Sequence, residues 1–372
     1  MGMGNRLPGP HTRAYGLLSL IAVCGEFPAD LLSHIPGSTS YLESLVWTLK
    51  REGLLRTYYR DRLRGYRLGR RAKQLLLQAQ PERFSFFLTG NTDTNLLKSE
   101  VTRRLRLHRI AELYVRMQNA GAAIFRDEKP RLFAPDTEEA WISRPVFYSS
   151  REVKELGLEA VKIRGSRMTG VLLTKAHVFL TYNSESSLAK WDYRAEQRAQ
   201  ALLNIVLCRR RFPTQYGQTQ VQGILFGSDM EPLFQILSSA DSGTRCFFLL
   251  DGNYEHFYYL TNDHYGEVLI RLLANPDQAA QLHNILSQGL CGNAAGFALE
   301  HDGISEDGEP VLFCHLPDIP RIHRFYAALQ LQERTGTVIC FDFQAECFRR
   351  CLGPNVTLQT IDFAKFERRF FP

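Results

Sequence analysis

The sequence has no hydrophobic run long enough to cross a membrane. Its longest apolar stretch near the start, residues 17–24, spans eight residues and includes Ser19, whereas a transmembrane helix needs about 20. The start of the chain also lacks the basic flank, the long apolar segment and the small-residue cleavage site of a secretory signal. These absences predict a cytoplasmic protein with no membrane partner.

Paired cysteines are also missing. The eight cysteines are scattered and lie mostly inside apolar runs, as small buried hydrophobic residues do. None belongs to the Cys-x-x-Cys pair or the Cys/His set that a zinc site requires, so we predict no bound metal. Cys347 and Cys351 are four residues apart and fit one face of a helix.

Motifs of phosphate-binding and hydrolytic enzymes are absent as well. Residues 223–227 begin and end with glycine but lack the lysine and the spacing of a phosphate-binding loop, and no Gly-x-Ser-x-Gly occurs. His256 and His264 flank an aromatic strand, where the polar ends of a hairpin explain them. Residues 300–302, Glu-His-Asp, belong to a turn rich in glycine and acidic residues. We therefore predict no cofactor and no catalytic residue.

The composition that remains is that of a folded protein with several domains. Of its 372 residues, 44% are hydrophobic and 23% are charged, which excludes disordered and fibrous proteins. The length corresponds to two or three domains. We predict an α/β fold, α+β overall, with a first domain at 1–80, a linker and basic helix at 81–135, and an α/β domain at 136–372 that is divisible near 290–305.

The positive charge is concentrated at the beginning of the chain. The net charge is +6, but residues 1–132 carry +11 and the remaining 240 residues carry −5. Such an asymmetry indicates that a polyanion approaches the N-terminal third. A solvated basic face is the alternative explanation, and the local pattern decides between them.

Residues 11–80 have the element order of a winged helix-turn-helix. A helix at 11–24 is stopped by Gly25, a short helix follows at 28–35, and a third helix begins near Ser40, whose spacing to Glu43 fits a capping box. The third helix has an apolar stripe at i, i+3, i+4 and i+7, namely Leu42, Leu45, Val46 and Leu49. In this motif the third helix enters the major groove of DNA.

The polar residues of this helix suit contact with base edges and phosphates. They are Ser40, Tyr41, Ser44, Thr48, Lys50 and Arg51. Small polar side chains at the start of the helix let its backbone approach the bases closely. Trp47 lies about 100° round the helix from Val46, and we expect it to pack against the wing rather than to contact a base.

The expected wing is a basic hairpin. Residues 54–60 and 66–68 have strand-forming composition, and residues 61–65 form the polar tip between them. Its arginines can reach phosphates or a narrow minor groove; the predicted contacts are Arg56, Arg60, Arg62, Arg64 and Arg67. Each phosphate contact should steepen the salt dependence of binding by about 0.9 in log–log slope.

A connector helix is predicted at 98–119, after an exit strand or turn at 85–93. Its apolar face consists of Leu107, Ile110, Ala111 and Tyr114. Arg109 and Arg116 point the other way and Arg106 lies on the flank, where they either extend the phosphate-binding surface or are solvated.

Strand-like and helix-like runs alternate in the C-terminal part. The candidate strands are 161–164, 170–174, 178–182, 221–226, 246–250, 257–260, 310–315, 337–341 and 356–361. The candidate helices are 192–208, 230–238, 266–273, 277–287 and 322–334. The first three strands suggest a meander, and the rest alternates as in an α/β sheet.

Three features occur together ahead of the α/β part: Leu-Lys-Arg-Glu-Gly-Leu-Leu at 49–55, the arginine-rich wing and Gly-Tyr-Arg-Leu-Gly at 65–69. They resemble the replication-relaxation family of winged-helix proteins from bacterial plasmids and conjugative elements. The segments 95–100, 147–152 and 251–256 resemble a branch of such proteins carried by clostridial mobile elements. The resemblance implies a winged helix, a domain similar to restriction endonucleases, and a role in plasmid replication or transfer.

The nuclease comparison can be tested on individual residues. An active domain of that type has an aspartate on one strand and Glu-x-Lys on the next, because carboxylates hold Mg²⁺. Here residues 168–172 contain no acid, and Thr181 and Asn183 stand where the acid and the lysine are needed. The nearest Glu-x-Lys, at 152–154, is expected on a helix. We therefore predict a degenerate nuclease-like domain that is not an enzyme.

The favoured function is binding of double-stranded DNA by a protein of a mobile genetic element, in plasmid transfer, replication control or transcription. The C-terminal domain would serve assembly or docking, and the sequence leaves open whether a protein partner or a homodimer is involved. One alternative is a transcriptional repressor, which requires dimerisation and a palindromic site. The other is a diverged Mg-dependent nuclease, whose cleavage would be lost on changing an acidic residue of the C-terminal half.

Overall fold

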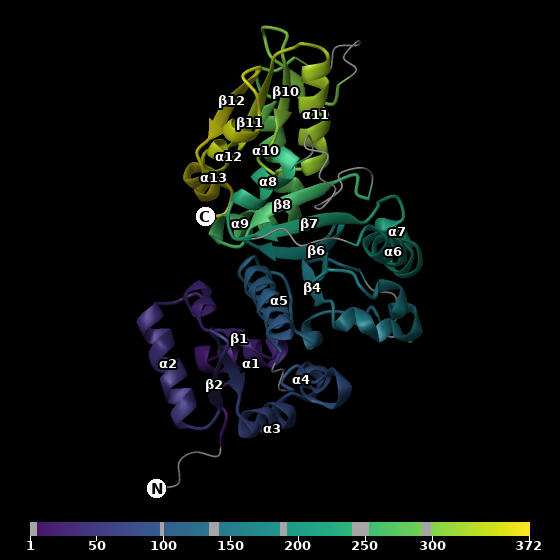
Figure 1. The fold of residues 1–372 in the computed structure, drawn as a ribbon. Helices are drawn as coiled ribbons and strands as arrows, with labels where there is room; N and C mark the ends of the chain where they lie inside the picture. The colour runs from purple at the N-terminus through teal and green to yellow at the C-terminus, as the bar shows by residue number, and fades with distance from the viewer. Residues whose placement is uncertain (1–5, 97–99, 134–140, 187–191, 240–252, 292–298) are drawn as a thin grey trace. The chain divides into compact units, whose positions relative to one another are not determined.

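The computed structural model describes residues 6–96, 100–133, 141–186, 192–239, 253–291 and 299–372 (Figure 1). The chain forms two compact units, the first made of residues 1–138 and 146–155 and the second of residues 139–145 and 156–372. Helices and strands occur in both, so the fold is mixed α/β, α+β overall. Within the described ranges, no helix has both the length and the apolar character that a membrane span needs.

The first unit begins with helices that surround a small antiparallel sheet. Its first elements are α1 (Arg13–Cys24), β1 (Phe27–Pro28), the 3-10 helix η1 (Asp30–His34), α2 (Thr39–Arg51), β2 (Leu55–Arg60) and β3 (Leu63–Leu68). The strands are ordered β1-β3-β2, and Tyr66 at the centre of β3 is opposite Phe27 and Thr57. Thr12 caps α1, and Gly25 ends it with a φ of 82°.

The apolar stripe of α2 packs into the core as its spacing predicts. Leu42, Val46 and Leu49 are buried together with Leu18 and Ile21 of α1. This burial of one face holds α2 on the small sheet and leaves the opposite face of the helix in solvent.

Three details of this region differ from the sequence-based expectation. The short second helix is a 3-10 helix of five residues. Helix α2 begins at Thr39 after Ser38, so Ser40 lies inside the helix and does not cap it. The hairpin turn contains only Asp61 and Arg62, because Arg60 pairs directly with Leu63 and the residues after it belong to β3.

Helices complete the first unit. The helices are α3 (Arg70–Ala79), α4 (Pro81–Leu88), η2 (Gly90–Thr92), α5 (Val101–Asn119) and η3 (Arg126–Glu128), and the last strand is β4 (Val146–Ser149). The expected exit strand or turn at 85–93 is wrong for residues 85–88, which are the end of α4, a helix that starts with Pro81 and buries Phe84 and Phe87. Residues 90–92 form the 3-10 turn η2. The apolar face of the connector helix is confirmed, since all four of its predicted residues are buried.

The second unit contains two separate sheets. In the first, β5 (Gly170–Leu173), β6 (Val178–Glu185), β7 (Gln222–Gly227) and β8 (Phe257–Thr261) are adjacent in that order; β5 and β6 are antiparallel, and the other pairs are parallel. The neighbouring helices are α6 (Tyr193–Leu203), the π-helix η5 (Asn204–Arg211), α7 (Pro213–Tyr216) and α8 (Glu231–Ser239).

The second sheet follows further along the chain. Its strands are β9 (Gly303–Ile304), β10 (Pro310–Phe313), β11 (Gly336–Phe341) and β12 (Val356–Ile361), in the order β12-β11-β10-β9. Strands β10, β11 and β12 are parallel, and β9 is antiparallel to β10. The helices are α9 (His264–Ala274), α10 (Pro276–Leu286), α11 (Ile319–Leu331), η6 (Asp342–Gln344), α12 (Ala345–Cys351) and α13 (Phe363–Phe370).

Most of the predicted C-terminal strands and helices occur, but their grouping is different. The expected strand at 161–164 is wrong, because Glu152–Ile163 forms 3-10 turns (η4) that are broken at Gly157. The expected three-strand meander is therefore reduced to the β5–β6 pair. The expected strand at 246–250 lies outside the described residues.

Candidate nucleic-acid interface

The exposed face of α2 carries the side chains that sequence reasoning assigned to DNA. Tyr41 is 50% exposed, Thr48 is half-buried, and the others, namely Ser40, Ser44, Lys50 and Arg51, are exposed. The Thr48 hydroxyl donates to the main-chain oxygen of Ser44 at 3.0 Å, which fixes its orientation on the helix surface. These side chains thus form an outward polar face of about three helical turns.

Trp47 does not pack against the hairpin as expected. Its side chain is 59% exposed, and the Arg51 guanidinium lies 4.6 Å from the centre of its ring. The spacing of four residues places the two side chains one above the other on the helix, which allows a cation–π contact. The indole is therefore part of the outward face.

Four of the five predicted hairpin arginines point into solvent. They are Arg56, Arg60, Arg62 and Arg64. Arg60 forms an ion pair with Asp61 at 3.4 Å, in which both side chains remain largely exposed. Pairs of this kind contribute little to stability, so the Arg60 guanidinium can exchange this partner for another anion at small cost.

Arg67 is the fifth, and its predicted phosphate contact is wrong. Its side chain is only 1% exposed. It donates to the main-chain oxygens of Asn95 and Leu96, each at 2.9 Å, and lies 3.8 Å from the Glu26 carboxylate. Arg67 is therefore a core residue at the base of the hairpin.

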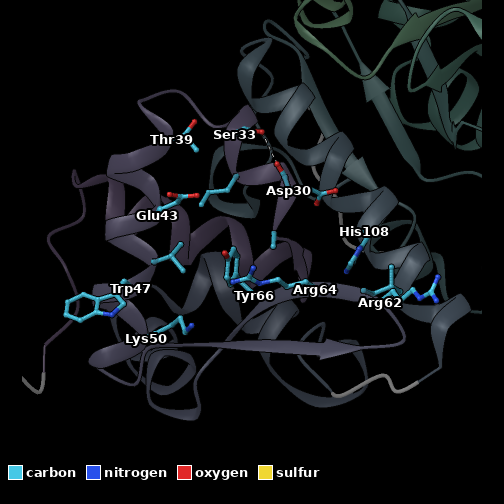
Figure 2. Close-up of a pocket in the computed structure, with 14 residues that line it drawn as sticks. Asp30, Ser33, Thr39, Glu43, Trp47, Lys50, Arg62, Arg64, Tyr66 and His108 are labelled. Carbon is cyan, nitrogen blue, oxygen red and sulfur yellow. Dashed lines mark hydrogen bonds between the residues drawn. The ribbon is translucent and has the colours of Figure 1, made fainter.

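A groove of about 740 Å³ separates α2 from the β2–β3 hairpin (Figure 2). The α2 side is lined by Thr39, Glu43, Trp47 and Lys50, and the hairpin side by Arg62 and Arg64, with Tyr66 between them. Three of the charged side chains that line the groove are basic, Lys50, Arg62 and Arg64, and two are acidic, Asp30 and Glu43.

Thr39 and Glu43 were missed by sequence reasoning. The spacing of Thr39, Glu43 and Lys50 along α2 indicates their shared position, because it places the three residues on one stripe beside the apolar face of the helix. Among the described residues, Glu43 has no hydrogen-bond or ion-pair partner. Its carboxylate is therefore an available acceptor in the groove.

A buried charged cluster lies beneath the hairpin. Glu26 is fully buried, and Arg104 of α5 donates to its carboxylate through Nη2 at 2.6 Å and through Nε at 3.0 Å. His108 Nε2 lies 3.0 Å from the same carboxylate. Burial raises the pKa of Glu26, but the hydrogen bonds with His108 and Arg104 outweigh burial and hold that pKa below its ordinary value.

The arginines of α5 do not form one surface. Arg106 is exposed and Arg109 is half-buried. Arg116, expected to point away from the apolar face, is 3% exposed and belongs to the buried part of the helix. It therefore neither extends a phosphate-binding surface nor lies in solvent.

The positions compared with nuclease residues are occupied by neutral groups. Thr181 is buried in β6, with its hydroxyl 3.2 Å from that of Thr169. Glu152 of the Glu-x-Lys segment lies in η4, as expected for a helical position, and forms a buried ion pair with Lys129 at 2.9 Å. In the part of the chain that the structure describes, no three His, Cys, Asp or Glu side chains are placed to hold a metal ion.

His256 has a specific partner in the second unit. Its Nδ1 lies 2.7 Å from the Asp318 carboxylate, which also accepts from the main-chain N–H of Phe257 at 3.2 Å. Asp318 is the residue before α11, but its side chain caps no N–H of that helix and is used for His256 and Phe257 instead. The pair is thus more than the polar end of a hairpin.

The chain matches no protein-family model, and its comparison with curated proteins and with solved structures gives no match.

Proposed function

We propose that residues 13–68 form a winged helix that binds double-stranded DNA, with α2 in the major groove and the β2–β3 hairpin as the wing. The order of helix, short strand, short helix, helix and hairpin supports this proposal, as does the strand order β1-β3-β2. In such a motif the apolar side of the third helix is buried and its outward side meets the base edges. Helix α2 has this division between its two sides.

The observation that carries the proposal is the position of the hairpin arginines beside α2. Arg62 and Arg64 line the same groove as Lys50, and Arg56 and Arg60 are exposed on the same hairpin. Cationic side chains on a helix and on the hairpin beside it can neutralise the backbone phosphates that border a major groove. A module that recognises only proteins has no electrostatic need for this arrangement.

The biological setting of the proposal comes from the sequence resemblance to replication-relaxation proteins. We propose plasmid transfer or replication control of a mobile element, with the second unit used for assembly or docking. The antiparallel β5–β6 pair next to parallel strands is compatible with a nuclease-like sheet. Thr181 and Asn183 lack the carboxylates through which Mg²⁺ is usually bound, so binding rather than cleavage is the proposed role.

The test is binding of the full chain to fluorescent 30-base-pair duplexes at several salt concentrations. Arg62→Ala combined with Arg64→Ala should weaken binding to all duplexes and flatten the log–log salt slope by about 1.8, because two phosphate contacts are lost. The matched control combines Arg194→Ala and Arg198→Ala, which removes two exposed arginines of α6. A wild-type protein that binds no duplex at low salt would refute the proposal.

The same experiment separates the alternatives. Selection of bound sequences from a random pool, followed by measurement of stoichiometry, distinguishes a monomeric contact from a repressor-like dimer on a palindromic site. Incubation of the bound duplexes with Mg²⁺ tests for cleavage, and the appearance of cut strands would replace the proposed role with an enzymatic one.

A further inference from the structure

The turn at the tip of the hairpin holds two non-glycine residues in the left-handed region. Asp61 has a φ of 53° and Arg62 a φ of 61°. A two-residue turn with positive φ at both positions usually has Asn-Gly or Asp-Gly, because glycine has no Cβ to clash at the second position. Arg62 therefore occupies a position where glycine is preferred, and its backbone is strained. Strain of this kind persists only where the surrounding structure enforces it.

The enforcing contacts come from Arg104 of α5. Arg104 Nη1 donates to the main-chain oxygen of Arg60 at 2.7 Å, and Nη2 donates to that of Leu63 at 3.0 Å. Arg60 and Leu63 are the two residues that flank the strained turn. One guanidinium thus holds both ends of the turn.

Arg104 is itself fixed from three sides. It is fully buried, its Nε and Nη2 are bound by Glu26, and its guanidinium lies 4.5 Å from the centre of the Tyr58 ring. The planar fork of donors reaches the carboxylate and both carbonyl oxygens at once, which the compact ammonium of a lysine cannot do. The hairpin is therefore held by a rigid group that does not belong to it.

We propose that Arg104 is a positioning residue that holds the strained turn and thereby presents the Arg62 guanidinium to a DNA phosphate. This inference rests on the proposed function, because Arg62 is assumed to contact DNA. The wing is ordered before DNA arrives, and binding does not have to order it. An arginine replaces the preferred glycine because its side chain is needed at the tip.

A double-mutant cycle tests the proposal in the full chain. Arg62→Ala and Arg104→Met should each lower the salt slope of duplex binding by about 0.9, and the double variant should also lower it by about 0.9 rather than 1.8. Additive losses would overturn the proposal, as would an unchanged slope for Arg104→Met. Arg103→Met is the matched control, because Arg103 is exposed and pairs with Glu100 on the same helix. Any change that Arg103→Met makes in the salt slope should add to the change made by Arg62→Ala.

Two further measurements cover variants that fold poorly or a protein that binds no DNA. Arg104→Lys keeps a positive charge beside Glu26 but loses the fork, so it should fold and still show the reduced slope. Hydrogen exchange of residues 55–68 in the free protein should accelerate in Arg104→Lys, while α1 stays protected. An unchanged exchange rate would refute the proposal that Arg104 holds the turn. Faster exchange in a chain that binds no duplex would support that role of Arg104 and would refute only the proposed function.

Discussion

The side chain of Glu26 fills the space next to Gly65 where any other residue would place its Cβ. A Cβ at Gly65 would lie 2.6 Å from Glu26 Cγ and 2.7 Å from Oε1. Because Arg104 and His108 hold this carboxylate, it cannot move aside without breaking their contacts. The glycine of β3 is thus required by a charged group and not by its own backbone angles.

Gly65→Ala should therefore destabilise the first unit by about 1–3 kcal/mol, the usual range for overpacking in a core. Gly16→Ala is the matched control, since a Cβ at Gly16, in the first turn of α1, would meet nothing within 4 Å. That variant should stabilise the protein by up to about 1 kcal/mol through helix propensity. Urea unfolding measures the free energy of unfolding of both variants. Equal values would show that the Glu26 side chain can move away from a Cβ at residue 65 at little cost.

Substitution of Arg64 should weaken DNA binding and leave stability unchanged, whereas substitution of Arg67 should lower stability and leave binding unchanged. Arg67→Met removes a buried cation near Glu26 and leaves two main-chain oxygens without their donor, at a cost of about 3 kcal/mol. Arg64→Met changes an exposed side chain, and its stability should stay within about 0.5 kcal/mol of wild type. Duplex affinity should fall for Arg64→Met and should be retained by folded Arg67→Met. Thermal unfolding and salt titrations measure the two effects, and loss of DNA binding by folded Arg67→Met would contradict the assignment.

Substitutions on α2 should change which sequences are bound more than how tightly they are bound. The unpaired Glu43 carboxylate suits the amino group of cytosine in the major groove, where acidic side chains accept hydrogen bonds. Glu43→Gln should relax the preference at one base pair by about 1–3 kcal/mol of discrimination. Ser44→Ala should alter the preference at a neighbouring position. Sequence selection with both variants is the measurement, and identical selected sites would exclude α2 as the reading helix.

The His256–Asp318 pair should make stability depend on pH. The hydrogen bond to Asp318 raises the pKa of His256 above its ordinary value of 6.5, against the opposing effect of burial. Because the pKa of His256 is higher in the folded than in the unfolded state, the charged pair contributes its full stabilisation below about pH 6.5. This stabilisation is lost as the pH rises through the pKa of the folded state. Burial and, after it, the neighbouring His256 lower the pKa of His177, so the contribution of His177 to stability depends on pH in the opposite direction.

Comparison with Asp318→Asn isolates the His256 contribution. Asparagine can still accept from the main-chain N–H of Phe257 but cannot stabilise an imidazolium ion. The difference in melting temperature between wild type and this variant, measured from pH 5 to pH 8, should shrink as the pH rises. A constant difference would show that the pair acts only as a neutral hydrogen bond.

Local patterns were sufficient to predict α1 and α2. The spacing of Leu42, Val46 and Leu49, together with Gly25 as a stop signal, is information contained within one helix. Pro81 carries a similar local signal, because proline in the first turn is typical of a helix start. This signal predicts the helix that continues through 85–88, where a strand or turn is expected without it.

The buried arginines could not be predicted in the same way. Arg67 belongs to the same arginine-rich strand as the exposed Arg64, and its partners, Glu26 and the carbonyl groups of residues 95 and 96, are distant in sequence. Arg104 had a signal, because it lies on the same stripe of α5 as Leu107 and Ala111. A charge on an apolar stripe indicates a buried partner, but the identity of that partner depends on contacts distant in sequence.

Helix α5 connects the hairpin with a second buried ion pair. Arg104 lies near its start, and Tyr114, about 15 Å further along, has its hydroxyl 3.4 Å from the carboxylate of Glu152, which pairs with Lys129. The hairpin and the Glu152–Lys129 pair are therefore both attached to the same helix. If the chain binds DNA as proposed, displacement of the Glu152 segment would strain the contacts that hold the hairpin and would weaken binding from a place that DNA does not contact.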